Sequence, residues 1–265
     1  MKVAIIGAGN MGGALAHGLA QGSLIKTTNI YISNPSVAKL EAIKGEFPEI
    51  NVTTNNCEVA TVADIIVLAV KPWKVAEVLE EIKPYVDYSR HAMASMVGGL
   101  TIAELSNLLD KGDGVLPATY IIIPNTAIAT KSSMTFISSA RSTELMDSTL
   151  CDVFSELGCA MLVDESAMPA ATSLASCGIA YAMRYIRAAM EGGVELGIRA
   201  DDAKRIVMQT LRGAVDVLDA SGSHPEAEID RVTTPGGLTI KGLNAMEAAG
   251  FTHSVIEGLR ASTKR

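Results

Sequence analysis

Three glycines near the N-terminus have the spacing of a turn that binds a dinucleotide. Gly7, Gly9 and Gly12 follow the apolar run at 2–6 directly, and a helical pattern begins at Asn10. In such a turn the first glycine permits a tight bend, the second lets the backbone approach a pyrophosphate, and the third allows close packing of helix on strand. Glycine-rich packing without a ligand is the alternative. The expected cofactor contacts here are Gly7, Ala8, Gly9, Asn10, Met11 and Gly12.

The residues after the second expected strand bear on the choice of cofactor. Enzymes that use NAD commonly have Asp or Glu about 20 residues beyond the glycines, where it binds the ribose hydroxyls. This chain has Ser33 and Asn34 there, followed by Pro35. Without a carboxylate to repel it, a 2′-phosphate could be accepted by the Ser33 hydroxyl and the Asn34 amide, with Lys39 as a more distant candidate. The pattern favours NADP(H) and leaves NAD(H) open; a plain turn or helix cap is the alternative.

A later strand ends in the sequence LAVKP, from Leu68 to Pro72. Ligands of open α/β sheets bind at the carboxyl ends of the strands. We therefore expect the backbone of Ala69, Val70 and Lys71, together with Pro72, to line the nicotinamide ribose, with Lys71 adding positive charge. An ordinary helix start at Pro72 is the alternative.

A second turn without acid–base side chains lies in the C-terminal quarter, in the sequence TTPGGLT at 233–239. Pro235, Gly236 and Gly237 come just before a helical pattern, so backbone amides should be free at a helix start, which favours a carboxylate or a phosphate. Thr234 and Thr239 add hydroxyls that both donate and accept hydrogen bonds. A simple helix cap is the alternative.

The elements that position these turns divide the chain into two parts. Apolar runs at 2–6, 29–33, 64–70, 91–97, 115–123, 134–138 and 159–163 alternate with helical patterns. Continuous apolar runs are typical of strands that helices cover on both faces, in a mainly parallel sheet. After Pro169 the patterns are helical only. We expect an α/β protein with a Rossmann-type doubly wound sheet at 1–163 and an all-helical dimerisation and substrate-binding domain at 164–265.

Composition excludes several classes of function. The net charge is −7 and the isoelectric point is near 5.2, which is against binding to nucleic acid or to a membrane surface. The longest charge-free stretches contain prolines, so we interpret them as core and expect no membrane span. The four cysteines form no CxxC pair and the four histidines have no metal-ligand spacing. We expect small-molecule partners, no metal and a cytoplasmic location.

Taken together, these motifs resemble the pyrroline-5-carboxylate reductase family. The resemblance rests on the glycine turn, AVKP at 69–72, PNT at 124–126, the small-residue helix around Tyr181 and, above all, VTTPGGLT at 232–239. It covers essentially the full length. It implies reduction of the C=N bond of 1-pyrroline-5-carboxylate to L-proline by NADPH or NADH, the last step of proline biosynthesis. It also implies helices that interlock in a homodimer, with five dimers often assembled into a decamer.

The resemblance also implies roles for single residues. Glu165 lies where the family has an acidic substrate contact, and the segment Thr234 to Gly237 lies where backbone binds the substrate carboxylate. Thr239 lies where a hydroxyl meets the ring nitrogen, which makes it the expected catalytic residue. On the cofactor side the matching positions include the 7–12 turn, Ser33, Asn56 and 69–72. The chain departs from the family pattern at 121–127 and at 176–179.

Two alternatives stay open from the residues alone. One is an enzyme like the β-hydroxyacid dehydrogenases, which share the glycine turn and a helical second domain. Those enzymes need a lysine on the interdomain helix, and residues 170–183 contain none. The other is a non-catalytic protein that binds NADP(H) or a metabolite. Small residues at 170–182 and 188–193 suit close helix contacts, from which we expect a homodimer.

Overall fold

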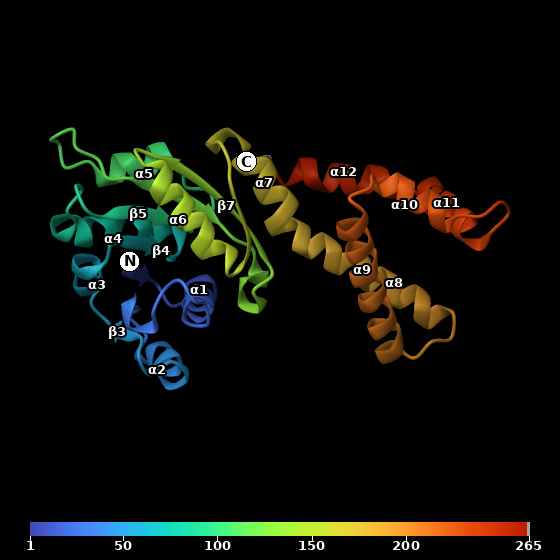
Figure 1. Cartoon of the computed structure of the whole chain (residues 1–265), viewed down its shortest axis with the longest axis horizontal. Helices are drawn as coiled ribbons and strands as arrows, with labels where there is room; N and C mark the ends of the chain where they lie inside the picture. Colours follow the sequence, from blue (N-terminus) through green and yellow to red (C-terminus); the bar gives the residue numbers. More distant parts are fainter. Residues whose placement is uncertain (264–265) are drawn as a thin grey trace. The chain divides into compact units, whose positions relative to one another are not determined.

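The computed structural model describes residues 1–263, which form two compact units. The first runs from Met1 to Ser176 and the second begins at Cys177 (Figure 1). Sheet and helices make up the first unit, whereas the described part of the second is helical. The expected fold class, a Rossmann-type α/β domain followed by helices, is confirmed.

The first unit contains one eight-stranded sheet. Its order is β3-β2-β1-β4-β5-β6-β7-β8, and every neighbouring pair is parallel except β6 and β7. The chain moves from β1 outward to β3 and then returns to β4 beside β1, so the order reverses at β1. The strands are β1 Val3–Ile6, β2 Ile30–Ser33, β3 Asn51–Thr53, β4 Ile65–Leu68, β5 Ala92–Ser95, β6 Thr119–Ile123, β7 Ser133–Ala140 and β8 Gly158–Leu162.

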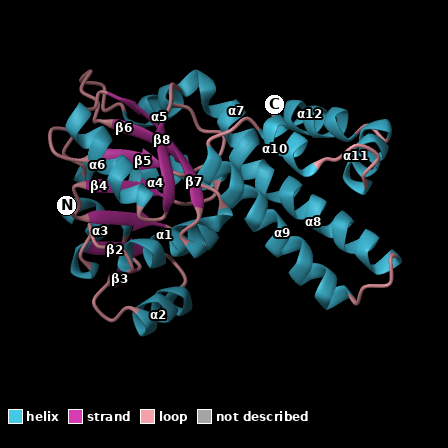
Figure 2. Cartoon of the chain, turned by 45° about the vertical axis from the view of Figure 1, so that its right-hand side comes forward, coloured by secondary structure: helices cyan, strands magenta, loops and turns pink. Residues whose placement is uncertain are grey.

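Helices cover both faces of this sheet (Figure 2). Alternate residues of β1 show why: Val3 and Ile5 belong to one buried cluster and Ala4 and Ile6 to the other. Residues of α1 and α6 pack in the first cluster, and those of α4 and α5 in the second. The helices of this unit are α1 Asn10–Ala20, α2 Val37–Glu46, α3 Asn56–Val62, α4 Val75–Ile82, α5 Ile102–Leu109, α6 Glu144–Ser155 and α7 Met168–Thr172.

Short turns of helix connect several elements. Five have 3₁₀ geometry and the last is a π-helix, which follows α7 directly. They are η1 Thr27–Asn29, η2 Pro72–Lys74, η3 Lys83–Tyr85, η4 Thr126–Thr130, η5 Glu165–Ala167 and η6 Ser173–Cys177.

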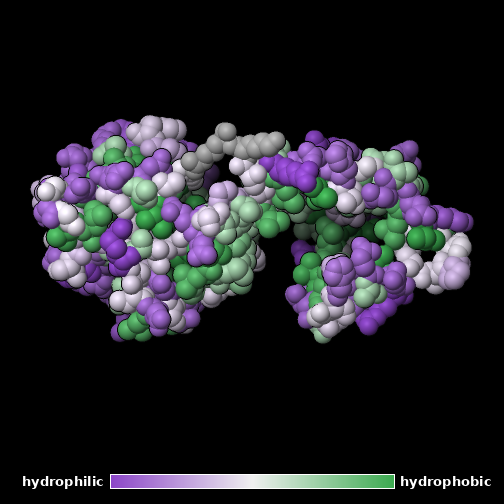
Figure 3. Space-filling model, turned by 90° about the horizontal axis from the view of Figure 1, so that it is seen from above, coloured by the Kyte–Doolittle hydropathy of each residue, from purple (hydrophilic) through white to green (hydrophobic). Residues whose placement is uncertain are grey.

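The second unit has almost no core of its own. Among its described residues only Ala203 is buried, whereas Leu196 is 85% and Leu238 is 87% exposed. Apolar patches are visible on the molecular surface in Figure 3. The helices are α8 Gly178–Glu195, α9 Ala200–Ser221, α10 Pro225–Val232, α11 Leu238–Ala248 and α12 Phe251–Ala261. No helix within residues 1–263 has the length and apolar character that a membrane span requires.

Candidate functional site

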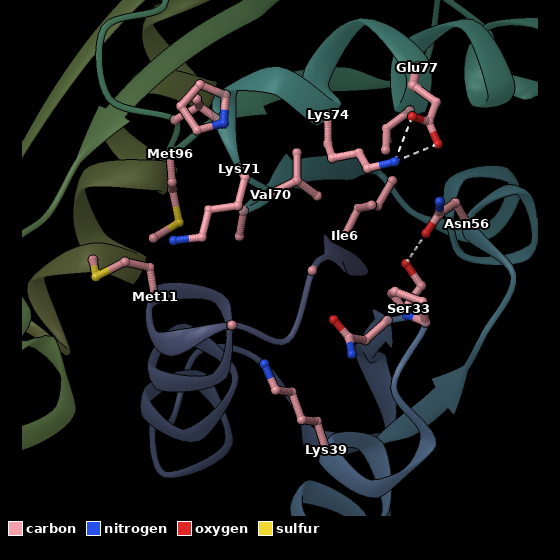
Figure 4. A pocket seen from close by; sticks show the side chains of 18 of the residues that line it. Ile6, Met11, Ser33, Lys39, Asn56, Val70, Lys71, Lys74, Glu77 and Met96 are labelled. Atoms are coloured by element: carbon pink, nitrogen blue, oxygen red, sulfur yellow. Dashed lines mark hydrogen bonds and ion pairs between the residues drawn. The ribbon is translucent and has the colours of Figure 1, made fainter.

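A cavity of about 770 Å³ lies at the carboxyl ends of β1, β2, β4 and β5, where the strand order reverses (Figure 4). Open α/β sheets bind their ligands at this kind of position. All of the expected cofactor residues except Ala8 and Gly12 line the cavity. They are Gly7, Gly9, Asn10, Met11, Ser33, Asn34, Asn56, Ala69, Val70, Lys71 and Pro72.

Glycine suits each of the three positions in the first turn for a different structural reason. Gly7 has φ of 108°, and a Cβ on it would lie 2.6 Å from the Ala69 carbonyl oxygen. A Cβ on Gly12 would overlap the Gly7 carbonyl. Around Gly9, by contrast, no atom lies within 4 Å of such a Cβ, so this position opens onto free space. Gly7 and Gly12 are therefore required by packing, and Gly9 leaves room for a ligand.

The start of α1 presents unpaired amides to the cavity. Gly9 is the N-cap and contributes no side chain, and no acidic residue stands in the first turn. The first intrahelical bond runs from Gly13 N–H to Gly9 O at 2.8 Å. The amides of Asn10, Met11 and Gly12 therefore lack helical partners and give the helix end partial positive charge. This arrangement suits a phosphate.

The side chains at the end of β2 are committed to other protein groups. Ser33 is fully buried, and its hydroxyl donates to Asn56 Oδ1 at 2.7 Å. Asn34 Oδ1 accepts from Ala8 N–H at 3.0 Å, and its Nδ2 donates to Ser36 O at 3.3 Å. The amide of Asn34 thus ties the glycine turn to β2. Both residues line the cavity, and the Ser33 hydroxyl and the Asn34 NH₂ group each donate a hydrogen bond to another group of the protein.

The loop that follows β4 packs against the glycine turn. Ala69 N–H donates to Ile6 O at 2.9 Å, and Pro72 begins the short helix η2. In Figure 4 the Lys71 side chain lies beside Met11 and Met96. Pro72 therefore starts a helix, and the same loop lines the cavity, whereas its contact with a nicotinamide ribose stays a prediction.

Sequence reasoning missed several residues of the cavity. Glu77 and Glu81 lie one turn apart on α4, which a helical projection of 75–82 could have shown. The segment 96–98 follows β5, the neighbour of β4, so it reaches the same edge of the sheet. Lys74 Nζ pairs with Glu77 Oε2 at 2.7 Å. The pKa of the Cys57 thiol beside Asn56 is raised, mainly by burial and next by the charge of Glu81.

The Pro-Gly-Gly turn of the second unit is a β-turn that leads into α11. Gly237 N–H donates to Thr234 O at 2.9 Å, and Gly236, after Pro235, has φ of 72°, as a type II turn requires. A Cβ on Gly237 would lie 2.5 Å from Thr234 Oγ1 and 3.0 Å from Thr234 O, so a larger residue here would require the exposed Thr234 side chain to move. The Gly237 amide is therefore used within the turn. Thr239 is exposed in the first turn of α11, where amides have no helical partner.

The structure gives Glu165 a contact that the sequence did not predict. Its Oε1 accepts from Ile102 N–H at 2.5 Å, at the first turn of α5. Glu165 begins η5 and belongs to the first compact unit, whereas the residues 234–239 belong to the second. His224, the other titratable residue near the turn, is the N-cap of α10 and accepts from Glu226 N–H.

Two family models match this chain. The model described as pyrroline-5-carboxylate reductase dimerisation matches residues 165–265. The model described as NADP oxidoreductase coenzyme F420-dependent matches residues 2–93. The first match covers the helical part of the chain. The second covers the glycine turn and the first strands of the sheet.

Known proteins resemble the chain over its full length. Pyrroline-5-carboxylate reductase 2 of Dictyostelium discoideum is 36% identical, and the alignment covers 100% of this chain and 91% of the relative. Reductase 1 of the same organism is also 36% identical over 99% of this chain, which spans about half (49%) of that relative's length. The crystal structure of Plasmodium falciparum pyrroline carboxylate reductase with NADP bound has a TM-score of 0.87 and 30% identity, covering 99% of this chain and 95% of that one. By full-length identity, the chain belongs to the pyrroline-5-carboxylate reductase family.

Proposed function

We propose that this protein reduces the C=N bond of 1-pyrroline-5-carboxylate to L-proline with NADPH or NADH, as the last step of proline biosynthesis. The observation that carries the proposal is the open position at Gly9, which faces a cavity of about 770 Å³ in a chain of this family. A relative at 30% identity was crystallised with NADP, which supports NADP(H) as the preferred cofactor and leaves NAD(H) open.

The chain fits a dinucleotide at this cavity. The unpaired amides of residues 10–12 would bind the pyrophosphate, and the residues 69–72 would line the nicotinamide ribose. A bound dihydronicotinamide supplies the hydride, so the protein has to hold and orient the substrate and exclude water. Because the cofactor supplies the hydride and the protein only positions the substrate, the proposed site can work without a histidine–carboxylate pair.

The substrate contacts follow from the family positions and the turn geometry. We assign the carboxylate of the imino acid to the turn of Thr234, Gly236 and Gly237, and a further substrate contact to Glu165. Because the Gly237 amide already donates to Thr234 O, the amides at the start of α11 add donors for the carboxylate. The protonated imine nitrogen accepts the C=N electron pair as the carbon takes up hydride.

Thr239 is the proposed catalytic residue. Its hydroxyl would hydrogen-bond the ring nitrogen and orient the ring, since a free hydroxyl is too weakly acidic to act as a full proton donor at neutral pH. Its exposed place in the first turn of α11 leaves the hydroxyl accessible to a small molecule.

The dimerisation match at 165–265 and the exposed apolar side chains of the second unit indicate an oligomer. We propose a homodimer, with the decamer of five dimers as the larger assembly that the family resemblance implies. A cytoplasmic location stays a prediction from the sequence.

Oxidation of NADPH in the presence of pyrroline-5-carboxylate tests the proposal on the full-length protein. We expect saturable oxidation that depends on the imino acid and yields proline. Thr239→Val should lower kcat while the Kd for NADPH stays unchanged. Binding of NADPH without oxidation would instead identify a non-catalytic binding protein. Oxidation of NADPH with a β-oxo acid in place of the imino acid would identify the dehydrogenase alternative.

A further inference from the structure

A directed chain of hydrogen bonds leads from the end of β2 to a carboxylate on α4. Ser33 Oγ donates to Asn56 Oδ1 at 2.7 Å, and Asn56 Nδ2 donates to Glu81 Oε2 at 2.8 Å. Because a carboxylate only accepts hydrogen bonds, the NH₂ group of Asn56 must face Glu81. Its carbonyl oxygen then faces Ser33, which leaves that hydroxyl the role of donor.

This series of hydrogen bonds holds the Glu81 side chain in place, although that side chain is exposed. Ser33 is fully buried, and Asn56 begins α3, whose N-cap Asn55 accepts from Cys57 N–H at 2.9 Å. A glutamate on a helix surface normally samples many rotamers in water. Here the amide of Asn56 holds the carboxylate at the wall of the cavity.

Few charges compete with Glu81 at this end of the cavity. The charged residues that line it are Lys39, Lys71, Lys74, Glu77 and Glu81. Lys74 and Glu77 pair with each other, and Lys71 lies beside the two methionines (Figure 4). Lys39, on the helix that follows β2, forms no ion pair with the residues 1–263 and extends toward the start of α1 in Figure 4. Lys39 and Glu81 are therefore oppositely charged residues of the cavity wall, and of the two only Glu81 is linked to Ser33 through Asn56.

We propose that Glu81 is a specificity-determining residue of the cofactor site, whose carboxylate opposes the 2′-phosphate of NADPH and thereby keeps NADH usable. The inference rests on the proposed function, since it assumes that the adenosine ribose binds near Ser33. Enzymes that use NAD place a carboxylate at the end of the second strand. Positions 33 and 34 lack one, and α4 supplies one from a distant part of the chain.

The chemistry of the two cofactors explains the direction of the effect. A 2′-phosphate carries negative charge and only accepts hydrogen bonds at neutral pH, so a fixed carboxylate nearby repels it. A free ribose hydroxyl can donate to a carboxylate. Removing the charge of Glu81 should therefore favour the phosphorylated ribose over the unphosphorylated one.

Calorimetry with two fragments of the cofactors tests this on the full-length protein. The ligands are ADP-ribose and 2′-phospho-ADP-ribose, whose binding needs neither substrate nor turnover. In Glu81→Gln we expect the ratio of the two Kd values to shift by about fivefold toward the phosphorylated ligand, and to shift less at high salt. Glu80→Gln is the matched control, because Glu80 is the preceding residue, pairs with Lys83 and should leave the ratio unchanged.

The outcomes separate the inference from the proposed function. If wild type binds both fragments and Glu81→Gln leaves their ratio unchanged or shifts it the other way, the role of Glu81 is wrong while the cofactor site stands. If wild type binds neither fragment, the cofactor site itself is wrong and the inference falls with it. Glu81→Ala must shift the ratio in the same direction, which keeps the test valid if Glu81→Gln does not fold.

Discussion

The two units of this chain differ in where their apolar side chains lie. In the first unit, strand residues such as Ile66 and helix residues such as Leu79 are fully buried. In the described part of the second unit, Ala203 alone is buried, and Ile206 three residues later is 52% exposed. The first unit buries an apolar core of its own, whereas the second leaves apolar side chains exposed, which is the surface that we propose a second copy covers. The mutations below test this difference.

The largest effect should come from the core of the first unit. Ile66, at the centre of β4, has no exposed surface. Ile66→Ala removes buried methyl groups and leaves a cavity, which should lower the free energy of unfolding by about 2–5 kcal/mol. Urea denaturation followed by circular dichroism measures the loss. An unchanged midpoint would contradict the packing of this sheet.

A charge on the second unit should act on assembly instead. Ile206→Glu places a carboxylate on the exposed apolar surface of α9. We expect the mass in sedimentation equilibrium to fall toward that of one chain while the first unit keeps its secondary structure. Lys204→Glu, on an exposed residue of the same helix, is the control and should keep the assembly intact. If Ile206→Glu keeps the wild-type mass, as the control does, this part of α9 lies outside the interface.

Two glycines of the first turn should separate stability from binding. Gly12→Ala forces a Cβ against the Gly7 carbonyl and should cost about 1–3 kcal/mol of stability, because it overpacks the turn. Gly9→Ala meets no protein atom within 4 Å, so it should lower the unfolding temperature less than Gly12→Ala does, by no more than the small cost of alanine at a helix N-cap. Its binding of NADPH should weaken by about tenfold or more, equal to about 1.4 kcal/mol. Tight binding by Gly9→Ala would exclude the dinucleotide from this turn.

The smallest effect concerns pH. Burial, and next the charge of Arg90, lower the pKa of His91 below its ordinary value of 6.5. The unfolded chain then takes up a proton that the folded protein resists, so stability falls as pH drops below 6.5. His91→Asn should lose part of this decline, which urea midpoints at pH 7.5 and 5.5 would measure. An identical decline in the variant would show that carboxylates alone cause it.

The sequence predicted elements better than it predicted long-range contacts. Seven strands were expected near their observed positions because their apolar runs are continuous, but β3 was missed, since its residues 51–53 are half-buried and partly polar. The glycine turn was predictable because its three positions are local. The contact of Ser33 with Asn56, and of Asn56 with Glu81, joins residues more than 20 positions apart, so the fold alone brings them together. For the same reason, the hydrogen bond from Ile102 N–H to Glu165 could not be predicted from the residues alone.

Transfer of deuterium tests the central claim most directly. Full-length protein is incubated with pyrroline-5-carboxylate and NADPH that carries deuterium at the transferable position of the nicotinamide, and the product is analysed by mass spectrometry. The proposed reaction predicts proline with one deuterium on the former C=N carbon. Proline without deuterium, or no proline while NADPH binds, would contradict hydride transfer by this protein.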